Sequence, residues 1–322
     1  MKQTLDDSRL EKIFNRLENP QSAIRNSQLR QPVHVVYGGA DRFKADTPQK
    51  LGKVALKSLR EYSPDAETFA EIFNLKSDVS DPVLRRVEKK LETEAVEDFR
   101  IDFEDGYGFR ADKEEDEHAI AASGELARSF QENTISPFSG FRVKSFRPET
   151  AKRAVRTLDL FLTNLLEKTG GKLPENFVVA LPKVETESQV TVLTELLSEF
   201  EAKNNLPENV LKLEILIETP QAIVNEKGEI NLRKLVKAAE NRCLAAHFGA
   251  YDFTSAFGIV AEYQHLNHPL CDFARQWMQV ALAPLGIRLS DSVTTLMPIP
   301  PHKGENLSIE QLQENKRAMT AA

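Results

Sequence analysis

Two carboxylates follow two consecutive apolar segments, and their placement suggests a site for a divalent cation. Glu218 ends the segment LEILIE, and Asp252 ends the segment LAAHFGAYD. If both segments are parallel strands, the two side chains meet at the same edge of the sheet. Two carboxylates held that close repel each other unless a cation lies between them. Mg²⁺ accepts one or two protein carboxylates and keeps its other positions for water and substrate, so Glu218 and Asp252 are predicted to bind Mg²⁺, with Mn²⁺ as the alternative ion.

A second group of acids follows another apolar segment, in the sequence RIDFEDGYG. It contains Asp102, Glu104 and Asp105. Asp102 and Glu104 are expected to share one face of a strand, while Asp105 begins the turn at Gly106. Buried carboxylates there would orient water around the metal or hold nearby cations, so all three are candidate catalytic residues.

Two basic residues lie at corresponding points of neighbouring segments. Arg142, in FRVKS, needs an anion if its strand is buried, and its planar guanidinium fits a carboxylate or a phosphate. Substrate binding and an ion pair with the acidic cluster both remain open for it. Lys183, in LPKVE, could form a salt bridge with Glu185 or a Schiff base with substrate. The surrounding acids would keep its pKa high, which disfavours the Schiff base.

Small residues accompany these candidates. Gly38 and Gly39 follow the first predicted strand, and Gly249 precedes Ala250 and Asp252. Glycine lets the backbone approach a ligand closely, so Gly38, Gly39, Gly249 and Ala250 are candidate substrate contacts.

The elements that must position these residues follow a regular order. Short apolar runs rich in Val, Ile, Leu and Phe read as buried parallel strands, and longer stretches with helical spacing lie between them. The expected strands are Pro32–Val36, Phe99–Glu104, Phe141–Ser145, Val178–Glu185, Leu213–Glu218, Leu244–Asp252 and Arg288–Thr294. This alternation predicts an α/β fold of the TIM (β/α)8-barrel type, with its active site at the C-terminal ends of the strands.

One barrel-sized domain accounts for most of the chain. We expect a polar helical lead-in over residues 1–31 and a barrel over residues 32–322. A helical insert is expected at about residues 47–95, between the first two strands, with Thr47 as the N-cap of its first helix.

Composition narrows the class of protein further. The 322 residues contain 42 Lys and Arg against 49 Asp and Glu, and a net charge of −7 argues against a nucleic-acid partner. Cys243 and Cys271 lack the spacing of a metal site and read as free thiols in a reducing compartment. The chain has no apolar run of roughly 20 residues and its first residues do not resemble a signal peptide. The sequence therefore predicts a cytoplasmic protein without a membrane partner.

Taken together, the motifs IDFED, FRVKS, ALPKVE, LIETP and HFGAYDFTSAFG resemble, in that order, those of the citrate lyase beta-subunit and HpcH/HpaI aldolase superfamily. The resemblance implies a TIM barrel that breaks or forms carbon–carbon bonds next to a carbonyl, on 2-oxoacid or acyl-CoA substrates. It implies that Glu218 and Asp252 bind Mg²⁺ and that Arg142 binds a carboxylate or enolate oxygen of the substrate. It also implies a homo-oligomer, a trimer or hexamer, and makes Arg42, after the first strand, a candidate for CoA binding.

The chain departs from that superfamily in its last part. No segment matches the HPxQ motif that marks the eighth strand, and the chain between Glu218 and Asp252 is longer than is typical. We therefore expect an uncharacterised branch of the superfamily with an incomplete or atypically closed C-terminal unit.

Three functions remain open at this point. The leading hypothesis is a Mg²⁺-dependent carbon–carbon lyase or aldolase that acts on a 2-oxoacid or a β-hydroxyacyl-CoA through a metal-stabilised enolate. A Mg²⁺-dependent enzyme that handles phosphoenolpyruvate or pyruvate is the second; it would need a phosphorylatable residue, for which His247 is a candidate, although its apolar surroundings are more typical of a core histidine. The third is a non-catalytic, degenerate barrel.

Overall fold

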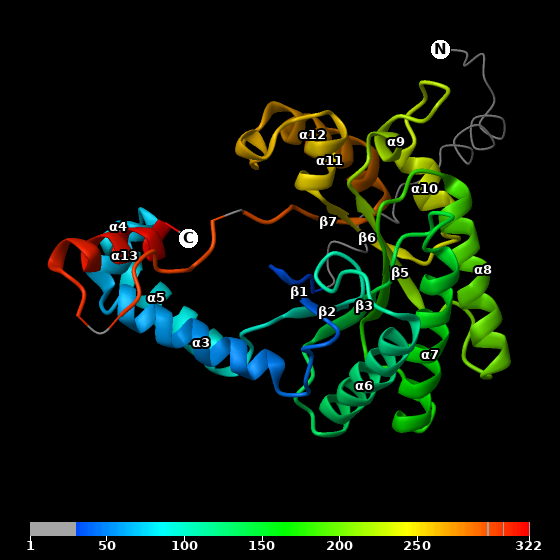
Figure 1. The fold of residues 1–322 in the computed structure, drawn as a ribbon, viewed down its shortest axis with the longest axis horizontal. Coiled ribbons are helices and arrows are strands. Elements are labelled where there is room, and N and C mark those ends of the chain that lie inside the picture. The colour runs from blue at the N-terminus through cyan, green and yellow to red at the C-terminus, as the bar shows by residue number, and fades with distance from the viewer. Residues whose placement is uncertain (1–29, 295, 305, 322) are drawn as a thin grey trace, which may run out of the picture.

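A seven-stranded, all-parallel sheet forms the centre of the protein (Figure 1). The computed structural model describes residues 30–294, 296–304 and 306–321. The strands are β1 (Val35–Gly39), β2 (Asp98–Asp102), β3 (Phe138–Arg142), β4 (Phe177–Leu181), β5 (Lys212–Ile217), β6 (Cys243–Phe248) and β7 (Arg288–Ser290). They pair in chain order from β1 to β7, and within the described residues no ladder joins β7 back to β1. The α/β class and the barrel-like strand order are thus confirmed, and the seven strands form a curled, TIM-barrel-like sheet that is not closed within the described residues.

The strands occupy the predicted regions with shifted ends. β3 ends at Arg142 rather than Ser145, β4 at Leu181 rather than Glu185, and β6 at Phe248 rather than Asp252. β1 covers Val35–Gly39 instead of Pro32–Val36. An apolar run continues into a turn when the turn is buried, so the pattern of residue types overestimates where the ladder ends.

Three long helices cover the outer face of β2 to β5. They are α6 (Asp112–Gln131), α7 (Ala151–Thr169) and α8 (Glu187–Lys203). The outward side chains of the strands pack against them, as in the stacked pair Phe141 and Phe161, whose ring centroids lie 4.1 Å apart. The inward side chains of β2 are charged instead: Asp98, Arg100 and Asp102 alternate with the apolar residues and are all buried.

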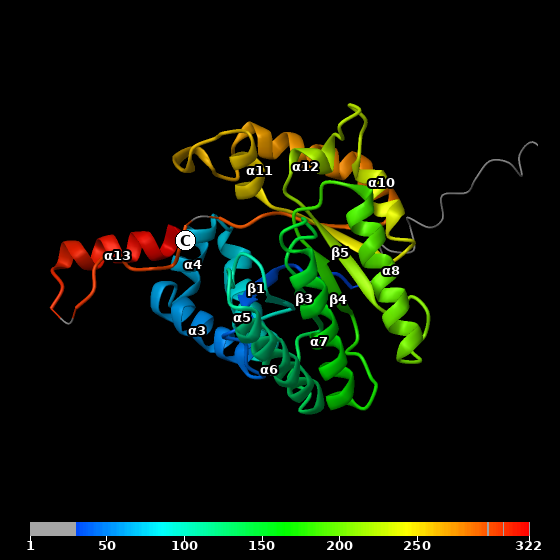
Figure 2. The ribbon, with the colours of Figure 1, turned by 45° about the vertical axis from the view of Figure 1, so that its right-hand side comes forward.

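Three helices occupy the stretch between β1 and β2: α3 (Thr47–Tyr62), α4 (Ala66–Phe73) and α5 (Ser77–Thr93). With the last helix, α13 (Ile309–Ala321), they lie beside the barrel rather than over the site (Figures 1 and 2). Thr47 is the first helical residue and not the N-cap, which is Asp46. The expected lead-in over residues 1–31 falls, except for residues 30 and 31, outside the described residues.

Short helices follow β5 and β6 at the C-terminal edge of the sheet. They are α9 (Pro220–Ile223), α10 (Leu232–Ala238), α11 (Ala250–Ala256), η1 (Ala261–Tyr263), α12 (Pro269–Leu282) and η2 (Ala283–Leu285). Because α11 begins directly after β6, Asp252 lies in the first turn of a helix and not at the end of a strand. None of the helices described is long and apolar enough to cross a lipid bilayer.

A buried ion pair ties α8 to the segment before β6. Both guanidinium Nη atoms of Arg242 donate to Glu201 at 2.7 Å, and Glu201 also accepts the backbone N–H groups of Asn209 and Leu211. Burial raises the pKa of Glu201, but these hydrogen bonds outweigh it and hold the pKa below its ordinary value.

Glu201→Gln is expected to lower the free energy of unfolding by about 3 kcal/mol at pH 7, because Arg242 stays buried without a counter-ion. A depressed pKa adds stability above the ordinary value of 4.5 and loses it as the pH falls through the folded-state pKa. The difference between the wild type and the variant should therefore shrink in urea unfolding at pH 3. Glu199→Gln, two residues earlier in α8 and exposed beside Lys203, is the control and should change little. An equal effect at both pH values would contradict this role of the pair.

Candidate active site

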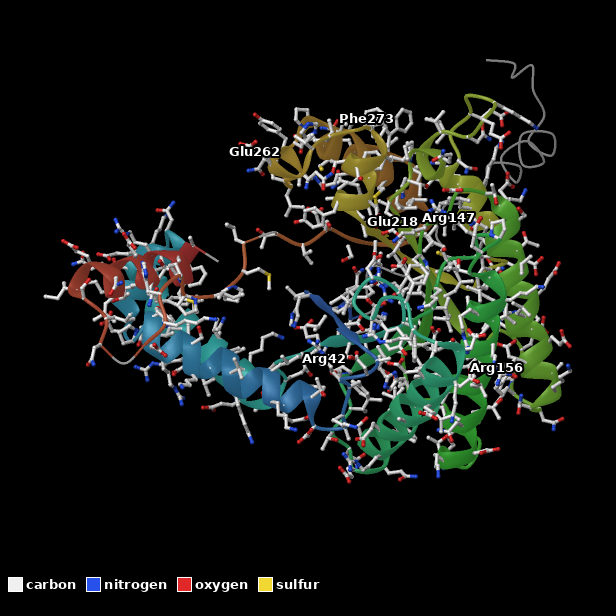
Figure 3. All side chains as sticks on the ribbon, viewed as in Figure 1. Arg42, Arg147, Arg156, Glu218, Glu262 and Phe273 are labelled. Carbon is white, nitrogen blue, oxygen red and sulfur yellow. The ribbon has the colours of Figure 1, made fainter. Side chains whose placement is uncertain are left out.

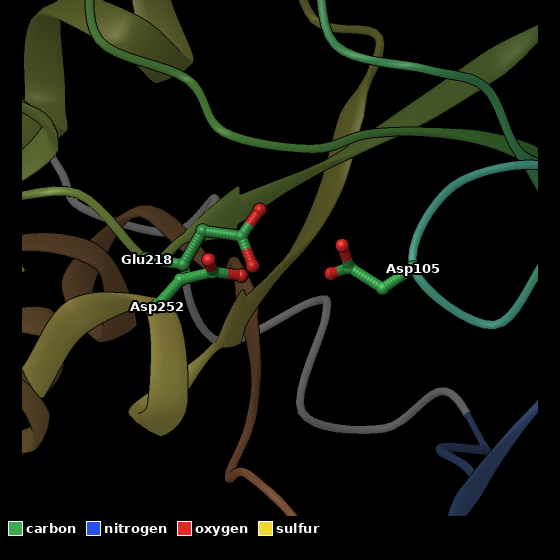
Figure 4. Close-up of side chains that lie close together, drawn as sticks. All are labelled: Asp105, Glu218 and Asp252. Carbon is green, nitrogen blue, oxygen red and sulfur yellow. The ribbon is translucent and has the colours of Figure 1, made fainter. Parts of the chain in front are cut away.

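Three carboxylates from three different elements converge at the C-terminal edge of the sheet. Asp105 comes from the turn after β2, Glu218 from the end of β5, and Asp252 from α11 (Figure 4). One oxygen of each lies within 4.8 Å of those of the other two. The predicted pair is brought together, and Asp105, expected only near the metal, lies close enough to be a third ligand.

The surroundings of Glu218 fix its carboxylate in this position. The backbone N–H of Lys183 donates to Glu218 Oε1 at 2.6 Å. A Cβ atom added at Gly249 would lie 2.6 Å from Glu218 Oε2, so only glycine leaves room for the carboxylate there. Burial raises the pKa of Glu218 to about 7; Lys183 opposes this shift and Asp252 adds to it.

Lys183 places its ammonium group among the acids. Its Nζ atom lies 2.7 Å from Glu104 Oε1, 3.0 Å from Asp105 Oδ1 and 3.1 Å from Asp252 Oδ2. Burial lowers the pKa of Lys183, but Glu218 and the other neighbouring carboxylates outweigh it and raise the pKa above its usual range. A protonated amine is not a nucleophile, which argues against the Schiff base. The alternative partner, Glu185, pairs with Arg147 instead, so the expected Lys183–Glu185 salt bridge is wrong.

Arg142 is buried at the end of β3. It forms an ion pair with Asp102, and such a pair with the acidic cluster was one of the two roles considered for it. Its Nε donates to Asp102 Oδ1 at 2.7 Å and its Nη2 to Asp102 Oδ2 at 2.5 Å. Its Nη1 lies 3.6 Å from Glu104 Oε2 and 3.7 Å from Asp105 Oδ2, which is too long for hydrogen bonds. Nη1 therefore faces the carboxylate cluster through longer ion-pair contacts and not through hydrogen bonds.

The acidic residues at the end of β2 and in the turn that follows have different roles. Asp102 is fully buried and also accepts the N–H groups of Glu104 and Gly106, at 2.9 and 2.7 Å, which folds the turn that presents Asp105. Glu104 lies in this turn and not, as expected, on the strand face shared with Asp102. Burial raises its pKa to about 7, together with the hydrogen bond with Asp105, while Lys183 and Arg142 act in the opposite direction.

The small residues predicted to contact substrate already have other roles within the protein. A Cβ atom would lie 2.7 Å from Phe99 at Gly38 and 2.6 Å from the carbonyl oxygen of Gly106 at Gly39, so internal packing already explains both glycines. The N–H of Gly249 donates to Ile217 and that of Ala250 to Ser292, which occupies both donors.

Arg42 lies away from the carboxylate cluster. Its side chain is 89% exposed, its nearest acid is Asp41 at 3.7 Å, and Figure 3 shows it apart from Glu218. The structure does not bring Arg42 into the site.

Tyr37 is the neighbour of Arg142 that the sequence analysis missed. The guanidinium carbon of Arg142 lies 4.8 Å from the centroid of the Tyr37 ring. The Tyr37 hydroxyl lies 3.0 Å from His247 Nδ1, and His247 Nε2 lies 3.3 Å from Glu214 Oε2. The only signal in the sequence is alternation, because Tyr37 and Gly39 fall on the same face of β1.

The carboxylate cluster fits a hard divalent cation. Its donors are oxygen atoms only, they come from three separate elements, and Gly249 makes space for one of them. Three carboxylates exceed the one or two that Mg²⁺ usually takes from a protein, and they suit Mg²⁺ or Mn²⁺ better than Zn²⁺, which prefers nitrogen and sulfur.

Known proteins share this fold at low sequence identity. A family model described as DUF6986, a domain of unknown function, matches residues 23–321. No curated protein matches the chain. A solved citrate lyase from Burkholderia xenovorans LB400 has a TM-score of 0.53 at 16% identity, covering 91% of this chain and 79% of that one. A Haloferax volcanii malate synthase in a pyruvate/acetyl-CoA ternary complex has a TM-score of 0.45 at 16% identity, covering 75% of this chain and 60% of that one.

The likeness to the citrate lyase concerns the fold. It agrees with the fold that the resemblance to the citrate lyase beta-subunit and HpcH/HpaI superfamily implied, and at 16% identity it shows the fold alone. What the chain does has to be argued from its own site.

Proposed function

Since the chain belongs to the DUF6986 family, whose description assigns no activity, we propose from its site that it is a Mg²⁺-dependent carbon–carbon lyase that acts on a 2-oxoacid or a β-hydroxyacyl-CoA. The observation that carries this proposal is the convergence of Asp105, Glu218 and Asp252 next to Nη1 of Arg142, which lies 3.7 Å from Asp105 Oδ2. A cation ligand set beside a buried guanidinium suits a substrate that carries both a carbonyl and a carboxylate.

Each residue has a separate task in this proposal. Asp105, Glu218 and Asp252 would hold Mg²⁺, which when bound polarises the substrate carbonyl. Arg142 Nη1 donates to the substrate carboxylate and to the oxygen on which negative charge develops when the carbon–carbon bond breaks. Asp102 keeps the guanidinium in this orientation, and Lys183, which pairs with Glu104, Asp105 and Asp252, balances part of the negative charge of the carboxylates.

The contacts of His247 disfavour a phosphoryl-transfer enzyme. Both of its ring nitrogens have close partners, Tyr37 and Glu214, and its side chain is buried. A phosphoryl acceptor needs a free, accessible nitrogen. A cytoplasmic location, a homo-oligomeric state and the use of CoA stay predictions.

Hydrogen exchange at the substrate tests the proposal without knowledge of the second product. In D₂O, the protein with Mg²⁺ is expected to replace the C3 hydrogens of pyruvate, or the methyl hydrogens of acetyl-CoA, by deuterium, because both exchanges pass through an enolate. Proton NMR follows the loss of the signal. Chelation of the metal should abolish the exchange. Exchange of both compounds no faster than without protein would contradict the proposal.

Lys183→Met is expected to raise the affinity for Mg²⁺ about tenfold, because it removes a positive charge about 3 Å from Asp105 and Asp252. Calorimetric titration of wild type and variant measures the change. Lys203→Met, on the exposed face of α8, is the control and should leave the affinity unaltered. A lower affinity in Lys183→Met would mean that the ammonium group assembles the carboxylates and does not compete with the cation.

A further inference from the structure

We propose that Tyr37 is a positioning residue for Arg142, and that a buried network beneath the site holds Tyr37 in place. Tyr37 would thereby set the affinity for the substrate carboxylate without touching the substrate. This inference rests on the proposed function, because it assigns substrate binding to Arg142.

Arg142 is restrained on two sides. Its Nε and Nη2 edge is paired with Asp102, and its guanidinium carbon lies over the Tyr37 ring, 4.8 Å from the centroid. A guanidinium held along one edge can still tilt about that edge. A ring at this distance from the guanidinium carbon hinders the tilt and adds a cation–π attraction. The two contacts together leave Nη1 pointing toward the carboxylate cluster.

Tyr37 is itself fixed through its hydroxyl. The hydroxyl lies 3.0 Å from His247 Nδ1, and the two rings meet edge to face at an interplanar angle of 86°. Because the Glu214 carboxylate can only accept, a neutral His247 must carry its proton on Nε2. His247 Nδ1 is then an acceptor, and the Tyr37 hydroxyl donates to it. Burial raises the pKa of Tyr37, so the hydroxyl keeps its proton.

The base of this network is rigid. Glu214 accepts from Arg100 Nε and Nη2 at 2.9 to 3.0 Å, and Arg100 also donates to Asp98. Arg100, Glu214 and Asp98 are at most 1% exposed. A buried, fully paired network of this kind does not relax easily when one member moves. The order of contacts from the base to the site is thus Arg100, Glu214, His247, Tyr37 and Arg142.

This network lies where an ordinary barrel has layers of aliphatic side chains, and it borders the open edge of the sheet. A crevice of about 310 Å³ lies between β1 and β7, and its lining includes Asp98, Glu214, His247 and Arg288. The charges of Asp98, Arg100 and Glu214 are buried and are balanced by one another. The position of Arg142 therefore depends on polar contacts made next to the gap between β1 and β7, and not on close apolar packing.

The expected consequence is a selective loss of anion binding. Tyr37→Leu should weaken binding of oxalate, a planar dianion that resembles the enolate of a 2-oxoacid, about tenfold in the presence of Mg²⁺. Mg²⁺ affinity should be unchanged, because Tyr37 has no contact with Asp105, Glu218 or Asp252. Tyr37→Phe keeps the ring and should stay within about threefold of wild type.

A matched control is available in the same sheet. Phe177 lies in β4 and packs against Phe141 on the outer face of the sheet, with ring centroids 6.0 Å apart. Phe177→Leu removes a buried aromatic ring without touching Arg142, Tyr37 or the network that holds Tyr37. It should leave oxalate binding unaltered, whereas a general loosening of the sheet would weaken both variants equally.

The test is a double-mutant cycle measured by calorimetry on the full chain with saturating Mg²⁺. If Tyr37 acts through Arg142, Tyr37→Leu should cost about tenfold in the wild-type background and almost nothing in the Arg142→Lys background. An equal cost in both backgrounds would overturn the inference. If Tyr37→Leu does not fold, Tyr37→Met, which fills the space with a flexible apolar chain, takes its place in the cycle.

The failures of the two proposals are distinguishable. If Arg142→Lys binds oxalate as tightly as wild type, the assignment of Arg142 in the proposed function fails. If Arg142→Lys weakens oxalate binding but Tyr37→Leu and Tyr37→Met do not, only the role of Tyr37 fails.

Discussion

Replacement of Glu218 by glutamine is expected to lower the affinity for Mg²⁺ by about 100-fold or more, because a neutral amide replaces one of three carboxylates at a hard cation. Asp252→Asn should have an effect of similar size. Glutamine keeps an oxygen that can accept a hydrogen bond from the backbone N–H of Lys183. It also removes a buried carboxyl group whose pKa is already raised to about 7, so little is lost in stability. The variant should therefore fold normally, and calorimetric titration with Mg²⁺ measures the loss.

The control for this prediction is Glu185→Gln. Glu185 lies close to Lys183 in the sequence, but its carboxylate pairs with Arg147 and is not part of the cluster. Its replacement should leave Mg²⁺ affinity unchanged. Equal Mg²⁺ affinity in wild type, Glu218→Gln and Asp252→Asn would remove the metal site from the account.

Arg142→Lys is expected to weaken Mg²⁺-dependent binding of oxalate by about 30-fold and to leave Mg²⁺ affinity intact. A lysine cannot pair with both oxygens of Asp102 and still direct a second donor at a substrate carboxylate. Calorimetric titration with oxalate at saturating Mg²⁺ gives the affinity.

Arg156→Lys provides the comparison for this substitution. Arg156 has the same forked contact, with Asp116, but lies on α7 on the outside of the protein (Figure 3). Its replacement should not affect oxalate. If oxalate bound equally well to Arg142→Lys and to wild type, Arg142 would be a structural residue only.

The convergence of Glu218 and Asp252 could be predicted because it depends on strand order alone. Parallel strands that are adjacent in the sheet bring their C-terminal ends together, and the apolar segments before both residues were recognisable. The incomplete closure also followed from the sequence, through the missing motif of an eighth strand. Both features can be predicted from the order of strands and helices along the chain, without their detailed geometry.

The turn that presents Asp105 could not be predicted in the same way. Its shape depends on where the β2 ladder ends and on the N–H groups that Asp102 accepts, and neither shows in residue types. The same limit applies to Lys183. Its neighbour in the sequence, Glu185, pairs with Arg147, while its actual partners come from the turn after β2 and from α11.

The network below the site was hidden for a related reason. Alternation in β2 indicates that Asp98 and Arg100 face the interior, but not that Glu214 from β5 completes the pair. Partners across a curled sheet depend on register and side-chain length, which one sequence does not reveal. His247 agrees with its interpretation as a core histidine, and its link to Tyr37 became visible only in three dimensions.

Calorimetric titration of the metal-free protein with Mg²⁺, alone and with oxaloacetate, pyruvate or phosphoenolpyruvate, tests the central claim most directly. The account predicts that Mg²⁺ binds and that at least one of the two oxoacids binds only when Mg²⁺ is present. Absence of both metal and oxoacid binding would contradict the proposed lyase and favour a barrel that has lost its catalytic function.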